Sequence, residues 1–286
     1  MLRLFKKLAR RAVLLSGDTA MFICGPTLGH NRLFIDFVAN NRLLQGSRRV
    51  VDFQMRLHMA GEYYNVLKRF HSQHFLRKSD YSYLEIGTSD YSSLFLAMGA
   101  KNVGVDPQPI QSARFNDSPK EYTVHLTTSD SFFEHYADSK DHYDLIFIDG
   151  LHTFEQAATD LVNVITRCSQ ADTDILIHDV IPINRTVANP KRETDFWTGD
   201  VYKIIYLLRE LDVRFRMIDA LPSGLLWLTG DQASKFANYY PVGDQLTTLL
   251  NGISRRIRVE DYKIQTFMDE IAGSLIKTSS IISMSA

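Results

Sequence analysis

YLEIGTSDYSSLFLAMGAKNVGVDP, at residues 83–107, is the stretch that decides the fold. It holds two short apolar runs, at 83–86 and 102–105, which end at Gly87 and Asp106. Short apolar runs that end at such turn residues are typical of strands buried on both faces. The residues between the two runs leave room for a helical crossover. The stretch therefore predicts the first strand–helix–strand unit of a parallel sheet.

The same alternation of strand and helix continues toward the C-terminus. Further strand-like runs lie at 122–126, 145–148, 174–177, 215–218 and 225–228, and helical stripes lie at 154–168 and 201–211. This order predicts a doubly wound α/β fold with a mostly parallel, seven-stranded, Rossmann-like sheet. We expect the sheet domain at 81–230, a helical N-terminal region at 1–80 and a helical C-terminal extension at 231–286.

The charge balance and the cysteines limit the class of protein. The chain has 32 basic and 33 acidic residues, a net charge of -1, so no global field for nucleic acid is expected. Its two cysteines, Cys24 and Cys168, form no CxxC motif. This favours a reducing compartment, and we expect the protein in the cytoplasm. Nothing in the sequence excludes a homo-oligomer.

The N-terminus is basic and weakly amphipathic. The basic residues before the first acid, Asp18, are Arg3, Lys6, Lys7, Arg10 and Arg11. The apolar run that follows them is too short for a signal peptide or a membrane span. The pattern favours a solvated surface helix, with weak interfacial membrane contact or a targeting peptide as the alternatives.

Acidic residues gather where the predicted strands end. Glu85, Asp106, Asp149 and Asp179 each lie at or directly beside such an end. Ligands of open parallel sheets bind beyond the carboxyl ends of the strands, and a row of acids there does not suit a phosphate group. The sequence has no GxxxxGK[ST] loop, and no GxGxxG follows the first strand, which disfavours nicotinamide cofactors. A cofactor with hydroxyls and a positive centre fits this edge better.

These strand ends resemble the first two cofactor motifs of class I S-adenosylmethionine-dependent methyltransferases. The resemblance implies that the turn after the first strand approaches the methionine part of the cofactor, that the acid after the second strand accepts from the ribose hydroxyls, and that the segment after the third contacts adenine. The cofactor-binding residues expected from it are Glu85, Gly87, Thr88, Ser89, Asp106, Ser129, Asp130 and Asp149. The family usually has more than one glycine in the first turn, where this chain has Gly87 alone.

A second constellation surrounds the later strand ends. Asp149 is followed three residues later by His152, and the next strand ends in His178 and Asp179. This arrangement is similar to metal-dependent O-methyltransferases that act on sugar hydroxyls of macrolide antibiotics. The resemblance implies that Asp149 and Asp179 bind Mg²⁺ or another divalent cation and that His152 is the catalytic base. We expect His178 as a further metal ligand, although the family often has an acid there and imidazole suits Mg²⁺ poorly.

The chemistry fits a weakly acidic acceptor. A sugar or alkyl hydroxyl needs a base, and a cation beside it, to become a nucleophile. We therefore expect a small hydroxylated molecule as the acceptor and no nucleic-acid partner. The polar segment 181–197 follows the predicted site, so we interpret it as a mobile substrate lid, with Trp197 lining the pocket. A metal-independent N- or O-methyltransferase, or a non-catalytic cofactor-binding or scaffolding module, is the alternative.

Overall fold

The computed structural model describes residues 62–88, 93–108, 121–137, 141–193, 196–238 and 243–283. Its strands are β1 Ser82–Ile86, β2 Lys101–Val105, β3 Thr123–His125, β4 Leu145–Ile148, β5 Asp174–His178, β6 Arg216–Asp219, β7 Leu225–Thr229 and β8 Leu275–Lys277. Its α-helices are α4 Glu62–Arg77, α5 Ser129–His135, α6 Phe154–Arg167, α7 Ile204–Glu210, α8 Gly230–Asn238, α9 Asp244–Arg256, α10 Ile264–Ile271 and α11 Thr278–Ile282. The predicted basic helix near the N-terminus lies outside the described residues.

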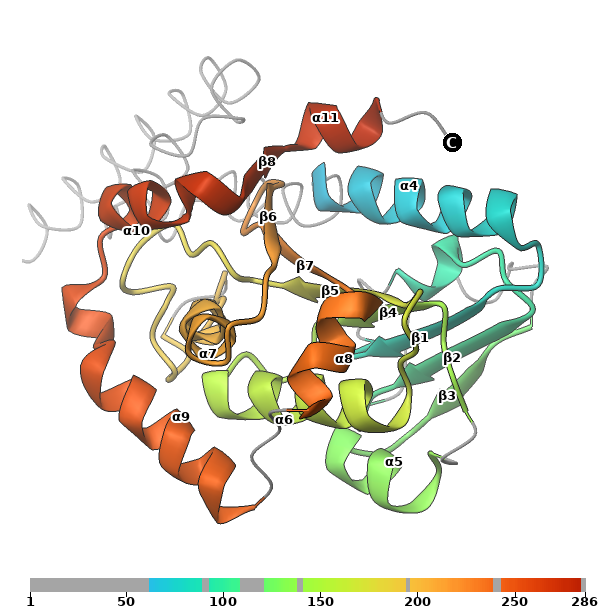
Figure 1. The fold of residues 1–286 in the computed structure, drawn as a ribbon, viewed down its shortest axis with the longest axis horizontal. Helices are drawn as coiled ribbons and strands as arrows, with labels where there is room; N and C mark the ends of the chain where they lie inside the picture. Colours follow the sequence, from blue (N-terminus) through green and yellow to red (C-terminus); the bar gives the residue numbers. More distant parts are fainter. Residues whose placement is uncertain are drawn as a thin grey trace, which may run out of the picture.

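The strands form one sheet in the order β3-β2-β1-β4-β5-β7-β6-β8 (Figure 1). Strand β7 is antiparallel to β5 and β6, and the other neighbouring pairs are parallel. Strands β4 and β5 are buried along their whole length, as their unbroken apolar runs predict. The predicted α/β fold with a mostly parallel sheet is therefore confirmed.

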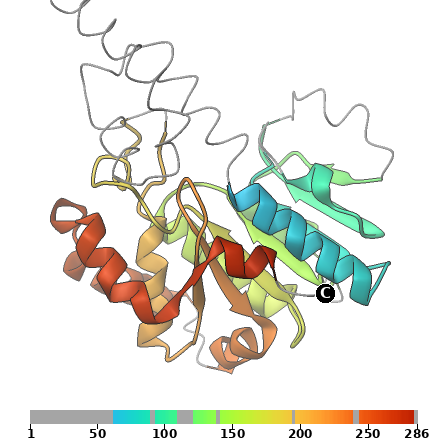
Figure 2. The same cartoon turned by 90° about the horizontal axis from the view of Figure 1, so that it is seen from above.

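Helices cover both faces of the sheet, so the fold is doubly wound. Helices α4 and α11 lie on one face and contact each other, while α5, α6, α7 and α8 pack on the opposite face (Figures 1 and 2). In α6 the apolar stripe predicted from the sequence faces the sheet, with Ala158 and Leu161 fully buried. The side chain of Thr153 caps this helix by accepting a hydrogen bond from the backbone N–H of Gln156.

The sheet has eight strands rather than the seven predicted. The eighth, β8, comes from the region predicted as a wholly helical C-terminal extension, and it pairs in parallel with β6. Three residues are too few for a period-2 pattern to be recognised in the sequence. The strand is stabilised by tertiary packing, because Leu275 contacts the core on one face of the sheet and Ile276 contacts the core on the other.

Helix α4 belongs to the predicted N-terminal region but packs directly on the sheet domain. Its buried residues Val66, Leu67 and Phe70 join the core that also contains Tyr83 and Phe147 of the central strands. This packing brings the start of α4 close to the carboxyl ends of β4 and β5, where the candidate site lies. Among the described residues, no helix is both long and apolar enough to cross a membrane.

Candidate active site

The parallel order of β2, β1, β4 and β5 brings the predicted strand-end residues to one edge of the sheet. Ile86 of β1 pairs with Ile148 of β4, and Ile148 pairs with Ile177 of β5. The next residues along these strands therefore emerge side by side, about 4.8 Å from strand to strand. The expectation that Asp149 and Asp179 follow neighbouring strands is met.

Gly87 forms the turn after β1 in a conformation that favours glycine. Its φ is +92°, and a Cβ atom placed there would lie 2.0 Å from the backbone oxygen of Asp149. Any other residue would push the β1 and β4 ends apart. The close approach thus holds the glycine turn after β1 against Asp149 after β4. This packing role does not depend on a bound cofactor.

Glu85 points into the protein rather than out of the sheet edge. It is fully buried, and its carboxylate accepts hydrogen bonds from the hydroxyl of Tyr83 at 2.7 Å and from the backbone N–H and hydroxyl of Ser93 at 3.0 and 2.9 Å. Because these contacts engage both oxygens, the structure gives Glu85 a role in holding Ser93 against β1. Ser89, also predicted to bind cofactor, lies outside the described residues.

Thr88 and Asp106 lie next to each other at the ends of β1 and β2. The hydroxyl of Thr88 is buried and has no hydrogen-bond partner among the described residues. One carboxylate oxygen of Asp106 accepts from the backbone N–H of Gln108 at 2.8 Å. Partial burial raises the pKa of Asp106, against hydrogen bonds from Gln108 and Thr88 that lower it. The two residues offer a donor and an acceptor at the position expected for the ribose.

Ser129 and Asp130 begin α5 and face α6. The side-chain amide of Gln156 donates to the Ser129 hydroxyl at 3.2 Å, to Asp130 at 3.0 Å and to Asp160 at 3.1 Å. The N-cap of α5 is Thr128. The amide of Gln156 therefore links α5 and α6, a contact that nothing in the sequence indicated. Burial raises the pKa of Asp160 to about 6.

Three side chains converge beyond the ends of β4 and β5. Nε2 of His152 lies 3.4 Å from Asp149, and Nδ1 of His152 lies 3.1 Å from Oδ2 of Asp179. One possible ligand atom from each residue falls within 4.8 Å of the others, the spacing of a metal-binding group. The side chains of Asp149 and His152 are about a quarter exposed, at 24% and 25%, so the cluster is open on one side.

His152 is held between carboxylates and a backbone carbonyl. Its Nδ1 lies 2.7 Å from the carbonyl oxygen of Trp197, to which it can donate. Burial lowers the pKa of His152, but Asp179 and Asp149 outweigh burial and raise the pKa to about 9. Burial raises the pKa of the Asp149 carboxyl, but the neighbouring imidazoles of His178 and His152 lower it more strongly. The pKa of Asp149 is therefore held far below the usual range. The carboxylates and the imidazole of His152 therefore interact strongly through their charges.

His178 differs from the prediction. We expected it among the metal ligands, and its Nδ1 lies 3.1 Å from Asp149 and 3.5 Å from Asp179, but the group of possible ligand atoms that lie within 4.8 Å of one another contains His152 and not His178. Nδ1 of His178 is 3.1 Å from Asp149, Nε2 is 3.3 Å from the hydroxyl of Ser223, and the ring stacks on Tyr63 with centroids 4.4 Å apart. Both nitrogens are thus engaged within the protein, and the structure places His152 in the group instead.

The segment 181–197 is more closely packed than the predicted mobile lid. Ile183, Val187 and Phe196 form a small buried cluster with Leu221. The exposed residues of the segment are Arg185 and residues 190–193, and residues 194–195 lie outside the description. Trp197 is partly exposed and its ring lies 5.3 Å from that of His152, so its predicted place beside the site holds. Whether the exposed part closes over substrate remains a prediction.

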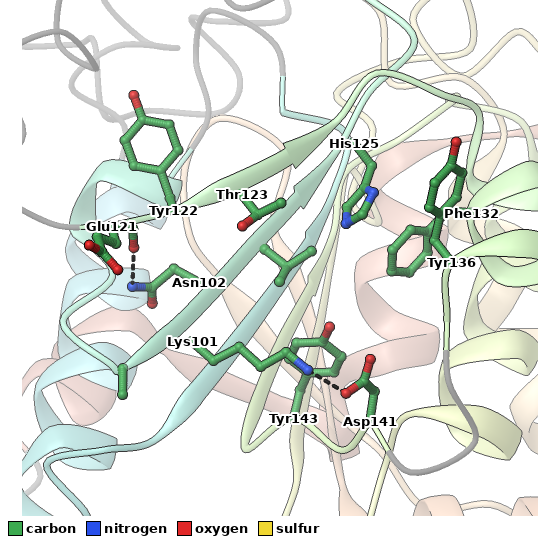
Figure 3. Close-up of a pocket in the computed structure, with 12 residues that line it drawn as sticks. Lys101, Asn102, Glu121, Tyr122, Thr123, His125, Phe132, Tyr136, Asp141 and Tyr143 are labelled. Atoms are coloured by element: carbon green, nitrogen blue, oxygen red, sulfur yellow. Dashed lines mark hydrogen bonds and ion pairs between the residues drawn. The ribbon is translucent and has the colours of Figure 1, made fainter.

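A cavity of about 260 Å³ lies elsewhere, on the outer edge of the sheet between β2, β3 and α5 (Figure 3). Its lining includes Thr123, His125 and Tyr136, with Lys101 paired to Asp141 at 2.5 Å. None of the predicted site residues lines it. The hollow therefore does not mark the chemical centre, which is identified by its side chains.

Comparisons with known proteins agree with this arrangement. Residues 84–180 match a family model described as a methyltransferase domain. No curated protein sequence matches the chain. The matched segment runs from β1 through the end of β5 and contains Gly87, Asp106, Asp149, His152 and Asp179, so the converging side chains fall inside it.

Solved structures of methyltransferases resemble the fold at low identity. An O-methyltransferase from Bacillus cereus in complex with SAH is 13% identical, with a TM-score of 0.42 over 57% of this chain and 80% of that one. The O-methyltransferase TomG from Streptomyces achromogenes, in complex with SAM, is 13% identical, with a TM-score of 0.42 over 58% and 78%. The N-methyltransferase NodS from Bradyrhizobium japonicum is 15% identical, with a TM-score of 0.37 over 57% and 93%. We infer no substrate from them.

Proposed function

We propose that the chain is a class I S-adenosylmethionine-dependent methyltransferase and that it methylates a hydroxyl group of a small molecule, such as a sugar or a glycosylated metabolite. The observation that carries the proposal is the convergence of Asp149, His152 and Asp179 beyond the ends of β4 and β5. A base and two carboxylates in contact are what activation of a weakly acidic hydroxyl requires.

S-adenosylmethionine supplies an electrophilic methyl group when it is bound. We assign its site to Gly87, Thr88, Asp106, Ser129 and Asp130, and Ser89, outside the described residues, stays a predicted member of it. The unpartnered buried hydroxyl of Thr88 and the partly exposed carboxylate of Asp106 fit a ligand with ribose hydroxyls. Because the turn at Gly87 adjoins Asp149 directly, this site would present the cofactor next to the catalytic cluster.

His152 is proposed as the base that takes the proton from the acceptor hydroxyl. Asp179 and Asp149 raise its pKa to about 9, so the ring would act as a base only where a cation held by the two carboxylates offsets their charge and lowers this pKa. Its Nδ1 lies within hydrogen-bond distance of the Trp197 carbonyl, which leaves Nε2 as the nitrogen that faces the acceptor. A carbonyl that accepts from one ring nitrogen fixes both the tautomer and the orientation of the ring. Trp197 thereby orients the base through its backbone and borders the acceptor through its ring.

Asp149 and Asp179 are the residues that would hold a divalent cation. Oδ2 of Asp179 is buried and accepts no hydrogen bond from the described residues, so it is an orphaned acceptor turned toward the cluster. Two carboxylates this close repel each other unless a cation or proton joins them. A bound cation would supply positive charge that stabilises the deprotonated acceptor. With an imidazole nearby, Mn²⁺ suits this set of donors better than Mg²⁺.

A second candidate is a metal-independent methyltransferase. Nδ1 of His178 lies 3.1 Å from Asp149 and 3.5 Å from Asp179, so an imidazole already stands between the two carboxylates. In this case His152 would act without a cation, on a hydroxyl or on a nitrogen. Metal dependence of the reaction separates the two candidates.

The direct test is methyl transfer from labelled S-adenosylmethionine to a panel of hydroxylated acceptors that includes free sugars, glycosides and phenols. We expect transfer to at least one sugar or glycoside, stimulated by Mn²⁺ and suppressed by EDTA. Transfer at the full rate in EDTA would favour the metal-independent candidate. The same assay is run with a matched panel of amines. Transfer to amines alone would contradict O-methylation.

A further inference from the structure

The turn between β6 and β7 reaches the catalytic edge of the sheet from the far side. Strand β7 runs antiparallel to β5, and Leu225 pairs with His178, so the residues just before Leu225 lie opposite those just after His178. The backbone N–H of Ile181 donates to the carbonyl of Ser223 at 2.6 Å. The sequence places Ser223 more than forty residues beyond Asp179, and no motif pointed to it.

The hydroxyl of Ser223 contacts two residues of the site at once. Its Oγ lies 2.5 Å from Oδ1 of Asp179 and 3.3 Å from Nε2 of His178. Ser223 is fully buried, and His178 and Asp179 are 3% and 1% exposed, so no bulk water competes for these contacts. A serine hydroxyl has one proton to donate and lone pairs to accept. It donates to the carboxylate and accepts from the Nε2–H of the imidazole.

Asp179 and His178, the two partners of Ser223, each have one remaining polar atom, and that atom points toward the site. Because Oδ1 of Asp179 is bound by Ser223, it is Oδ2 that approaches His152, at 3.1 Å. Because Nε2 of His178 faces Ser223, it is Nδ1 that approaches Asp149, at 3.1 Å. A single hydroxyl thus orients the two carboxylates of the cluster, one directly and one through His178.

Asp179 also needs external support, since its backbone lies in the left-handed region with a φ of +61°. A residue other than glycine in this region costs free energy unless its surroundings stabilise it. Gly224, with a φ of +73°, lets the β6–β7 turn come close: a Cβ there would lie 2.4 Å from the side chain of Ile181. The turn is therefore built to touch the residues around Asp179.

Helix α4 anchors the turn between β6 and β7. The carboxylate of Glu62 accepts from the backbone N–H of Leu221 at 3.3 Å, and the backbone N–H of Tyr63 donates to the Leu221 carbonyl at 3.3 Å. The ring of Tyr63 then stacks on His178. Helix α4 and the turn lie outside the matched segment 84–180, yet both contact the pair His178–Asp179.

We propose that Ser223 is a positioning residue of this methyltransferase: its hydroxyl holds Asp179 and His178 so that Oδ2 of Asp179 and the carboxylate of Asp149 face the acceptor and any bound cation. The proposal rests on the proposed function for its catalytic meaning. Groups that orient metal ligands typically contribute about 10–100-fold to metal affinity or activity, which sets the expected size of the effect.

The test compares Ser223→Ala with Thr173→Val in the full chain. Thr173 is a matched control because its buried hydroxyl donates to the Tyr143 carbonyl at 2.8 Å, just before the opposite end of the same strand. We expect Ser223→Ala to lower kcat, and to weaken Mn²⁺ binding, about 10–100-fold, with KM for S-adenosylmethionine unchanged. Thr173→Val should change neither. Equal kcat and equal Mn²⁺ affinity in the two variants would overturn the proposal.

A second readout keeps the proposal testable if the proposed function fails. The ring N–H groups of His178 can be observed by ¹H–¹⁵N NMR and assigned by their loss in His178→Gln. We expect the Nε2–H signal to disappear from Ser223→Ala and to persist in Thr173→Val. An unchanged signal overturns the proposal even in a protein that shows no transfer, and a lost signal with undiminished kcat overturns it too. If Ser223→Ala does not fold, Ser223→Cys, a weaker donor of similar size, replaces it.

Discussion

An aspartate and a histidine are in contact at each end of strand β5, and the two pairs differ in how their polar atoms are satisfied. At the amino end, Asp174 contacts Nε2 of His74 at 3.0 Å and accepts from the indole N–H of Trp227 at 2.7 Å, so both of its oxygens have partners. At the carboxyl end, Oδ2 of Asp179 accepts no hydrogen bond from the described residues, although His152 lies 3.1 Å away.

The comparison shows that a buried aspartate–histidine contact is not in itself a sign of catalysis. The pair at the amino end is satisfied by its neighbours and joins α4 to the sheet. The pair at the carboxyl end retains an unused acceptor, a partly exposed imidazole and a second carboxylate within ligand distance. Cavity size would mislead here, because a hollow of about 480 Å³ lies beside Asp174. The unsatisfied Oδ2 of Asp179 beside His152 and Asp149, rather than a hollow, is the reason that we propose the carboxyl end as the functional one.

Replacing the histidine of each pair should give the largest difference between the two ends of β5. We expect His152→Ala to lower kcat about 10²–10⁴-fold, since a general base typically contributes this much, and to leave affinity for S-adenosylhomocysteine unchanged. His74→Ala should lower the free energy of unfolding and keep kcat. Steady-state kinetics and urea denaturation of both variants check this. If His152→Ala keeps the wild-type kcat, the base lies elsewhere.

The aspartates give the second contrast. We expect Asp179→Asn to weaken Mn²⁺ binding and kcat by at least about 10–100-fold, because one anionic ligand is lost. Asp174→Asn should instead lower the free energy of unfolding by about 1–3 kcal/mol, because the contact with His74 is weakened in a buried place. Calorimetry with Mn²⁺ and urea denaturation separate the two effects. Equal loss of Mn²⁺ binding in both variants would remove the distinction between the two ends.

Asp106, after β2 at the same edge of the sheet, tests the proposed contact with the cofactor. We expect Asp106→Ala to weaken binding of S-adenosylhomocysteine by about 1.5–3 kcal/mol, the usual contribution of a hydrogen bond to a charged group. Asp172→Ala, which removes an exposed acid near the amino end of β5, serves as the control for loss of charge. Isothermal titration measures both. Wild-type affinity in Asp106→Ala would refute the ribose assignment.

Asp160 provides the smallest effect, on stability rather than on activity. Burial raises its pKa from the ordinary 3.8 to about 6, so ionising it in the folded state is costly. Stability from this group is fully present at low pH and is lost as pH rises toward and through 6. We expect the free energy of unfolding of wild type, relative to Asp160→Asn, to fall by about 1 kcal/mol between pH 5 and 7.5. A pH-independent difference between the two proteins would contradict this.

The sequence was sufficient to predict most of the fold. Strands buried on both faces appear as unbroken apolar runs, and helix α6 has a clear apolar stripe, so their order predicted the sheet. It was insufficient for β8, whose three residues form a strand only because β6 and the two cores lie beside them. The packing of Ile183 and Val187 was also hidden, because an irregular segment shows no period even when its side chains are buried.

The candidate site was predicted in part. The strand ends pointed to Asp149, His152 and Asp179 because neighbouring parallel strands must end at the same edge. Which way a strand-end side chain turns depends on contacts distant in sequence. His178 contacts Ser223 and Tyr63, and Glu85 contacts Ser93, and the sequence indicated neither set of contacts. Only the three-dimensional packing shows these orientations.

Calorimetric titration of the full chain with S-adenosylhomocysteine, in Mn²⁺ and in EDTA, tests the central claim most directly. We expect saturable binding in both solutions, since the proposed contact of Asp106 with the ribose does not involve the cation. We also expect a separate Mn²⁺ binding event that EDTA abolishes and that Asp179→Asn removes while Asp174→Asn retains it. Absence of S-adenosylhomocysteine binding in either solution would contradict the assigned cofactor site. Mn²⁺ binding that survives in Asp179→Asn would contradict the proposed centre.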